Sequence, residues 1–193
     1  MIPVNDLIKE AKQGSLKSFE ELVLLYQDRV YTHCVHLANN NYDAQDLAQD
    51  VFVQAFKNIR SFREEADFGT WLHRIAINLW INWCRKQKRA VMVSLDEPLM
   101  YGDNELSREL AASQESALEI LERTELHEQV RQALNRLPPE YKAVLVLREM
   151  EGYSYEDIAG FLNCSLGTVK SRINRARKAL LKEIKAGQNG GSQ

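Results

Sequence analysis

The chain of 193 residues lacks several features that would place it in common protein classes. It has no apolar run near the roughly 20 residues that a membrane-spanning helix needs, and we expect no signal peptide at its start. Its three cysteines, Cys34, Cys84 and Cys164, are scattered and odd in number, which favours a reducing cytoplasm without structural disulfides. Strand patterns are essentially missing as well, so the sequence predicts an all-α protein.

Signatures of catalysis and of bound cofactors are also missing. The chain has no Walker loop, GxSxG elbow, HExxH motif or pair of carboxylates arranged for acid–base work. His33, Cys34 and His36 could offer metal ligands because the two histidines lie one helical turn apart, but no CxxC or distant His/Cys pair completes a tetrahedral set. The alternative is that these side chains are neutral and partly buried. We therefore expect no catalytic residue, metal site, cofactor or small-molecule substrate.

The net charge of −2 conceals an uneven distribution along the chain. Residues 1–90 carry 12 basic and 11 acidic side chains, a net charge of +1. Residues 91–121 carry one basic and seven acidic side chains, a net charge of −6. Residues 122–193 carry 12 basic and nine acidic side chains, a net charge of +3. An acidic segment thus separates two segments that are nearly neutral or basic.

The same three segments differ in hydrophobic patterning. Helical periodicity is present up to about residue 90 and returns near Leu118. The sequence therefore predicts one helical domain at 1–90 and a second at 118–186, joined by a partly disordered acidic linker at 91–117. Residues 187–193, with the sequence GQNGGSQ, are predicted to form a flexible tail.

The C-terminal domain has the punctuation of two helices joined by a tight turn. Ser154 is a good N-cap for the first helix, with Asp157 at its third position, and Gly152 before it can accept a positive φ. Asn163-Cys164-Ser165 makes the turn, and Ser165 is a candidate cap for the second helix. This layout is typical of a helix-turn-helix that places its second helix in the DNA major groove.

The second of these helices separates apolar from basic residues. At about 100° per residue, one side carries an apolar stripe of Val169, Ile173, Ala176, Leu180 and Ile184. Residues 168–185 contain seven basic side chains against Glu183 alone. Solvated helix faces normally interleave both signs of charge, so nucleic-acid contact is favoured over simple solvation. The residues opposite the apolar stripe are Ser171, Asn174, Arg175, Lys178 and Lys182.

The N-terminal domain is predicted to contain four helices, at about 5–13, 15–38, 43–59 and 70–88. The side of the third that should be buried consists of Leu47, Ala48, Val51, Ala55 and Ile59. Its outward side consists of Asp46, Gln49, Asp50, Val53 and Lys57. An acidic face with an apolar residue in its middle suits a protein partner with basic groups. From this helix alone, simple solvation is the favoured interpretation.

The fourth helix carries a second unusual face. Its predicted core stripe consists of Leu72, Ile75, Ala76, Leu79 and Trp83. An adjoining stripe consists of Trp71, Arg74, Asn78, Asn82 and Arg85, and no acidic residue follows Asp67 until Asp96. Cations can track phosphates, rings can stack on bases and amides can read base edges, so this stripe fits single-stranded nucleic acid. Phe62 and Phe68 could wall a pocket for an unstacked base. For Trp71 and for each phenylalanine taken alone, core packing is an equally favoured alternative.

Four motifs together resemble the extracytoplasmic function (ECF) sigma factors, which are small sigma-70 relatives built from a σ2 domain, a linker and a σ4 domain. The motifs lie at 46–52, 68–78, 137–141 and 167–177, in the order and spacing of that family. The resemblance implies a protein that binds core RNA polymerase and directs it to a promoter. It also implies an anti-sigma factor as a further partner, which could hold the cytoplasmic protein at the inner face of the membrane.

The resemblance implies three binding surfaces, which our residue patterns extend. The surface for the β′ clamp helices of core polymerase consists of Asp46, Gln49 and Asp50, with Val53 added from the helix pattern. The surface for unpaired −10 bases consists of Phe62, Phe68, Trp71, Arg74 and Asn78, with Asn82 and Arg85 added from the stripe. The surface for the −35 duplex consists of Lys170, Ser171, Arg172, Asn174 and Arg175, with Lys178 added from the basic face. Contact with the polymerase β subunit is also expected.

Two departures from the family pattern limit what the resemblance implies. Asn174 stands where many relatives have another side chain, so the −35 sequence preference is not carried over. Ser165 replaces the proline that often begins the recognition helix. The main alternative function is a helix-turn-helix regulator that binds its operator independently of polymerase. A protein-interaction module is a third reading, and an enzyme is the least favoured.

Overall fold

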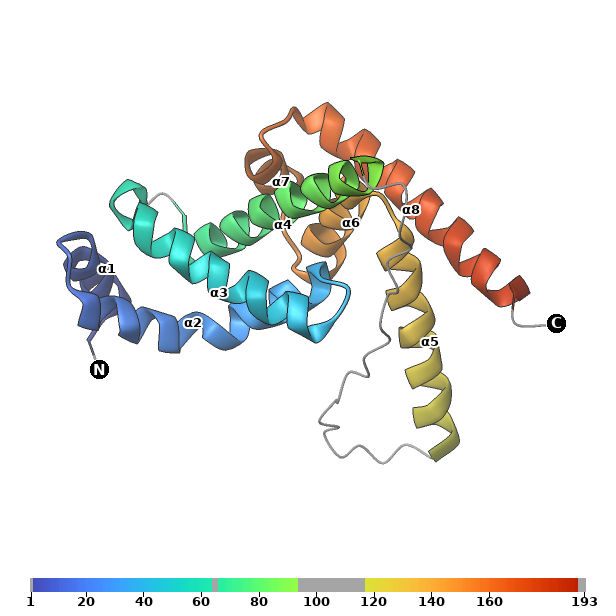
Figure 1. The fold of residues 1–193 in the computed structure, drawn as a ribbon, viewed down its shortest axis with the longest axis horizontal. Coiled ribbons are helices and arrows are strands. Elements are labelled where there is room, and N and C mark those ends of the chain that lie inside the picture. Colours follow the sequence, from blue (N-terminus) through green and yellow to red (C-terminus); the bar gives the residue numbers. More distant parts are fainter. Residues whose placement is uncertain (1, 64–65, 94–116, 191–193) are drawn as a thin grey trace. The chain divides into compact units, whose positions relative to one another are not determined.

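The computed structural model describes residues 2–63, 66–93 and 117–190 and divides the chain into two compact units, Met1–Asn104 and Glu105–Gln193 (Figure 1). All regular elements within the described ranges are helices, which confirms the all-α expectation. None of the described helices combines the length and the apolar character needed to cross a membrane.

The N-terminal unit contains the four helices that the sequence predicted. They are α1 (Val4–Lys12), α2 (Leu16–Leu37), α3 (Asn41–Asn58) and α4 (Phe68–Val93), with a 3₁₀ turn, η1 (Ile59–Ser61), after α3. The fourth helix continues to Val93, beyond the predicted start of the linker at residue 91. Most of the predicted linker, at 94–116, falls outside the described residues.

Short polar side chains set where these helices begin. The Ser15 hydroxyl accepts a hydrogen bond from the Ser18 backbone N–H at 3.2 Å, which caps α2. The Asn40 side chain accepts a hydrogen bond from the Asp43 N–H at 2.9 Å, which caps α3. Each bond satisfies a backbone donor that has no partner within its own helix.

The core of the N-terminal unit lies where α2 contacts α1, α3 and α4, and where α3 contacts α4. The predicted buried side of α3 is confirmed, since all five of its residues are buried. The predicted core stripe of α4 is only partly correct, because Ile75 and Leu79 are half-buried and Trp83 is 38% exposed. The buried side of α4 consists of Leu72, His73, Ala76, Ile77, Trp80 and Ile81. Contact with both α2 and α3 makes this side broader than a single stripe.

His33 and Cys34 of α2, which the sequence offered as possible metal ligands, are buried in this core. The imidazole of His33 stacks on that of His73 from α4, with ring centroids 4.1 Å apart and planes at 3°. Burial raises the pKa of the Cys34 thiol to about 12. Because metals bind the thiolate form, this burial makes Cys34 a poor metal ligand.

The C-terminal unit contains the predicted helix-turn-helix. Its elements are α5 (Ala117–Arg136), α6 (Pro139–Leu145), the π-helical turn η2 (Val146–Met150), α7 (Tyr155–Leu162) and α8 (Leu166–Gly190). The final helix passes residue 187, so the first part of the predicted flexible tail is helical. Extending an existing helix adds one hydrogen bond for each residue fixed, which can offset the low helix propensity of glycine.

The predicted punctuation of the helix-turn-helix is confirmed. Ser154 and Asp157 form a reciprocal capping box at the start of α7, and Gly152 before it has a φ of +74°. Asn163 ends α7 in the left-handed region with a φ of +47°. The Ser165 hydroxyl accepts a hydrogen bond from the Thr168 N–H at 3.1 Å, which caps α8.

The core of the C-terminal unit lies where α8 contacts α5, α6 and α7. From the predicted stripe of α8, Val169, Ile173 and Ala176 are buried, whereas Leu180 and Ile184 are only half-buried. The packing therefore holds the first half of α8 more firmly than the second, and the first half carries most of the residues predicted to contact DNA.

Candidate nucleic-acid interface

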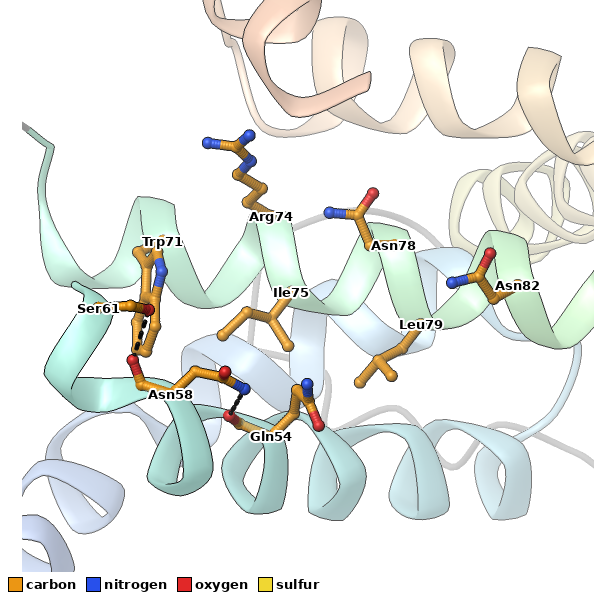
Figure 2. A pocket seen from close by; sticks show the side chains of 9 residues that line it. All are labelled: Gln54, Asn58, Ser61, Trp71, Arg74, Ile75, Asn78, Leu79 and Asn82. Atoms are coloured by element: carbon orange, nitrogen blue, oxygen red, sulfur yellow. Dashed lines mark hydrogen bonds between the residues drawn. The ribbon is translucent and has the colours of Figure 1, made fainter. Parts of the chain in front are cut away.

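A groove of about 350 Å³ lies between α3 and α4 in the N-terminal unit (Figure 2). The α4 side of its lining consists of Trp71, Arg74, Ile75, Asn78, Leu79 and Asn82. The α3 side consists of Gln54, Asn58 and, from η1, Ser61. The structure thus brings together four of the seven residues predicted for the −10 strand. Arg85 lies one helical turn further along α4 and is exposed.

The α3 side of the groove was missed by the sequence reasoning. Its hydrogen bonds hold the end of α3 in place: the Asn58 Nδ2 donates to the Gln54 carbonyl oxygen at 2.8 Å, and the Ser61 hydroxyl donates to the Asn58 carbonyl oxygen at 2.7 Å. The steps of four and three between these residues form a polar stripe that could have pointed to this wall. Placing it opposite α4 required the packing of the two helices.

An aromatic cluster supports one end of the groove. The Trp71 ring lies 5.1 Å from Phe62 and 5.5 Å from Phe68, and the two phenylalanine rings meet edge to face at 5.3 Å. Phe62 and Phe68 are only 4% and 3% exposed, while Trp71 is half-buried and also lines the groove. The two phenylalanines therefore pack behind Trp71. On their other side they line a smaller hollow of about 170 Å³, with α1 beyond it.

A polar contact ties the start of α4 to α2. The Asp67 Oδ2 accepts a hydrogen bond from the Thr70 N–H at 3.2 Å and lies 3.5 Å from the Arg29 Nη1. Gly69 leaves room for this guanidinium, because a Cβ at residue 69 would lie 2.6 Å from Arg29 Nη1. Burial, together with the negative charge of Asp67, raises the pKa of the Tyr26 hydroxyl on α2. These contacts place the aromatic cluster at a defined position on the unit.

The first half of α8 presents a basic surface opposite its buried stripe. The residues predicted for the −35 duplex are exposed, apart from Arg172, which is half-buried: Lys170, Ser171, Arg172, Asn174, Arg175 and Lys178. The Ser171 hydroxyl donates to the Thr168 carbonyl oxygen at 3.0 Å, so its proton serves the helix itself. The remaining groups project cations and an amide from a convex helix, which is the shape that the major groove admits.

One basic residue of α8 is paired within the protein. The Nε and Nη2 of Arg177 donate to Glu149 Oε1 from η2 at 3.0 and 2.6 Å. The hydrogen bond and the carboxylate charge raise the pKa of Arg177. Arg177 is one of the seven basic residues counted in 168–185, and its partner lies 28 residues away, where it leaves no local signal in the sequence. The pair reduces the net positive charge of the α8 surface.

The outward face of α3 combines acidic and apolar groups, as the sequence predicted. Asp46, Gln49 and Asp50 are exposed, and Val53 is 49% exposed. Phe56, which the sequence analysis did not single out, is 47% exposed on the same helix, and its ring meets Phe19 of α2 at 5.0 Å.

Comparison with known proteins identifies the family. Residues 22–90 match the family model of Sigma-70 region 2, and residues 127–180 match that of Sigma-70, region 4. The RNA polymerase sigma-H factor of Pseudomonas aeruginosa is 35% identical over 182 residues, which cover 92% of each chain. The ECF RNA polymerase sigma factor SigW of Bacillus subtilis is 36% identical over 180 residues, covering 92% of this chain and 95% of SigW. The chain belongs to the ECF RNA polymerase sigma factors.

Two solved structures are similar in fold to this ECF sigma factor. The sigma factor RpoE in complex with the anti-sigma factor NepR from Bartonella quintana is 28% identical, with a TM-score of 0.62 over 88% of this chain and 98% of that chain. CnrH in complex with the cytosolic domain of CnrY is 25% identical, with a TM-score of 0.60 over 93% of this chain and 96% of that chain. The groove lies within the region 2 match, and the region 4 match covers α7 and α8 as far as residue 180.

Proposed function

We propose that this ECF sigma factor binds core RNA polymerase, reads the promoter −35 duplex with α8, and captures unpaired bases of the −10 element in the groove between α3 and α4. The observation that carries the proposal is the groove, which places an aromatic ring, a guanidinium and several amides around one recess in the region 2 span. These are the groups that bind unstacked bases and their phosphates. No covalent step is assigned to this chain, since polymerase performs the chemistry.

The basic face of α8 supports duplex reading. Arg175 and Lys170 are exposed on the side away from the buried stripe, where they can reach base edges or phosphates. Arginine in the major groove commonly contacts guanine through two hydrogen bonds, and one good contact of this kind contributes about 1–3 kcal/mol of discrimination. Neighbouring lysines position the helix through phosphate contacts that carry no sequence information.

The groove supports strand opening because its favourable contacts require bases that have left the stack. Trp71 can stack on such a base, which typically contributes about 1–3 kcal/mol. Extracting a base from the duplex costs a few kcal/mol, so capture of several bases offsets much of the cost of melting. Binding to the groove therefore favours the open promoter over the closed one.

The acidic face of α3 supports docking on core polymerase, and the exposed side chain of Val53 gives it an apolar centre. The proposed site consists of Asp46, Gln49, Asp50 and Val53, facing the β′ clamp helices. The proposed contacts with polymerase include its β subunit. Because polymerase acts in the cytoplasm, we expect this protein there as well. The solved sigma factor RpoE, which resembles this chain, is in complex with the anti-sigma factor NepR, and this supports an anti-sigma factor as a further partner.

Gel filtration of the protein with core polymerase, followed by run-off transcription from a promoter library, tests the proposed function. The proposal predicts a stable complex and promoter-specific transcripts. The isolated protein should bind duplex DNA weakly, because each surface offers few contacts and the two units are separately folded. Tight operator binding by the isolated protein without polymerase would instead indicate an independent regulator.

Asp50→Arg tests the docking face. The charge reversal should weaken association with core polymerase while leaving circular dichroism unchanged, because the side chain is exposed and contributes complementarity rather than packing. Asp6→Arg on α1 changes the net charge equally and serves as the control. If Asp50→Arg competes for core polymerase as well as the control does, the acidic face of α3 is only solvated.

A further inference from the structure

We propose that Asn58 selects the base that enters the groove, favouring adenine and cytosine, which carry an amino group, over guanine and thymine, which carry a carbonyl oxygen at the corresponding position. The inference rests on the proposed function of the groove. Asn58 lines the wall opposite the predicted α4 stripe (Figure 2). The preference follows from the way the Asn58 side-chain amide is held.

The orientation of the Asn58 amide is fixed by the protein. Its Nδ2 donates to the Gln54 backbone carbonyl oxygen at 2.8 Å. The bond from the Ser61 hydroxyl goes to the backbone carbonyl oxygen of Asn58, at 2.7 Å, and leaves the side-chain Oδ1 untouched. Rotating the amide by half a turn would place Oδ1 against the Gln54 carbonyl oxygen, so two acceptors would face each other. The bond to Gln54 therefore leaves Asn58 with an acceptor, Oδ1, at a defined place on the groove wall.

The amides on the opposite wall are not held in this way. Among the residues that the structure describes, no protein group bonds the side-chain amide of Asn78 or Asn82. Each can rotate to present either its oxygen or its nitrogen and can therefore serve any base. Stacking on Trp71 is also tolerant of sequence, because every base has an aromatic face. Among the side-chain amides that line the groove, Asn58 is thus the one that a hydrogen bond holds in a preset orientation.

A preset acceptor distinguishes bases by the group at one position. Adenine has an amino group at N6 and cytosine at N4, and both donate hydrogen bonds. Guanine has a carbonyl oxygen at O6 and thymine at O4, and both are acceptors. An amino group facing Oδ1 gains a hydrogen bond, whereas a carbonyl oxygen there leaves two acceptors unsatisfied and desolvated. Such a mismatch costs more than the missing bond alone, which is how polar sites obtain selectivity.

The test uses holoenzyme assembled from the full chain and core polymerase. The probes are fluorescent single-stranded oligonucleotides that carry the non-template −10 element, with each position changed in turn through all four bases. For wild type, we expect one position at which adenine and cytosine bind roughly 3- to 10-fold more tightly than guanine and thymine, the range of one net hydrogen bond. Asn58→Leu should bring the four affinities at that position together, and Asn58→Ala provides a second variant if the leucine disturbs α3.

Two matched variants separate base selection from a structural role. Lys57→Ala, next to Asn58 on α3 but outside the groove lining, should leave the affinity ratio of amino to carbonyl bases unchanged. Asn78→Ala should weaken all four bases alike. The inference would be overturned if Asn58→Leu and Asn58→Ala left the affinity ratio of amino to carbonyl bases unchanged. It would also be overturned if the wild-type protein bound single strands with no preference for adenine and cytosine at any position. A holoenzyme that binds no −10 single strand at all would overturn the proposed function as well.

Discussion

The two surfaces that we propose contact DNA in this ECF sigma factor differ in shape and in charge. The face of α8 is a convex helix with several exposed cations and one amide, held by a buried stripe on its far side. The groove between α3 and α4 is a recess lined by one guanidinium, one indole and several amides. A convex basic helix suits the closed duplex, whereas a recess becomes useful only when a base has left the stack. The difference supports the proposed division of duplex recognition and strand opening between the two units.

The two surfaces also differ in how they are supported. The aromatic cluster packs behind the groove, and Phe68 of this cluster contacts Tyr26 of α2. The contact of Asp67 with Arg29 joins the segment before α4 to α2. The start of α8 depends on the capped turn at Ser165 and on packing against the helices of its own unit. Each surface therefore draws its stability from a separate core.

The largest effects should come from emptying one core at a time. Leu72→Ala removes a fully buried side chain from the N-terminal unit and should lower the free energy of unfolding of that unit by about 2–5 kcal/mol. Ile158→Ala should do the same in the C-terminal unit. Hydrogen exchange should lose protection in α2–α4 for the first variant and in α6–α8 for the second. Loss of protection in both units after either change would contradict separate cores.

A smaller effect should separate the surfaces by their dependence on salt. Lys178→Ala should reduce the slope of log K against log salt concentration by about 1 for binding of holoenzyme to −35 duplex, because one phosphate contact is lost. Asn82→Ala should weaken binding of −10 single strands with little change in slope, because an amide releases no counterion. Fluorescence anisotropy across a salt series measures both slopes. A loss of slope in Asn82→Ala equal to that in Lys178→Ala would remove the proposed distinction.

The smallest effect should come from the ion pair beside α8. Glu149→Gln removes a carboxylate near the basic face and frees Arg177, so binding of holoenzyme to −35 duplex should strengthen, by less than about fivefold because the groups are exposed and screened. Glu156→Gln, on the exposed side of α7, is a control with the same change in charge. Weaker duplex binding by Glu149→Gln would mean that the pair is needed to orient α8.

The parts of this structure that depend on local sequence could be predicted, and those that depend on helix packing could not. The capping box of Ser154 and Asp157 and the buried side of α3 follow from short-range spacing. The broad buried side of α4, including His73, follows from its contact with two neighbouring helices. The pairing of Arg177 with Glu149 joins elements far apart in the chain.

The groove shows the same division. Its α4 side follows from steps of three and four along one helix, and four of the predicted residues line it. Phe62 and Phe68 were left open between a base pocket and core packing, and they are buried behind Trp71. The α3 side, with Gln54 and Asn58, becomes part of the groove only through the packing of α3 against α4.

The most direct test of the division of labour compares Arg175→Ala with Asn78→Ala in holoenzyme on one promoter. Footprinting measures closed binding, and permanganate reactivity of thymines measures opening. Arg175→Ala should weaken closed binding by about 1–3 kcal/mol if its guanidinium makes a bidentate base contact. Asn78→Ala should leave closed binding intact and reduce opening, and a pre-melted bubble should rescue it only in part, because base capture remains impaired. Equal loss of closed binding in both variants would contradict the assignment of duplex reading to α8 and base capture to the groove.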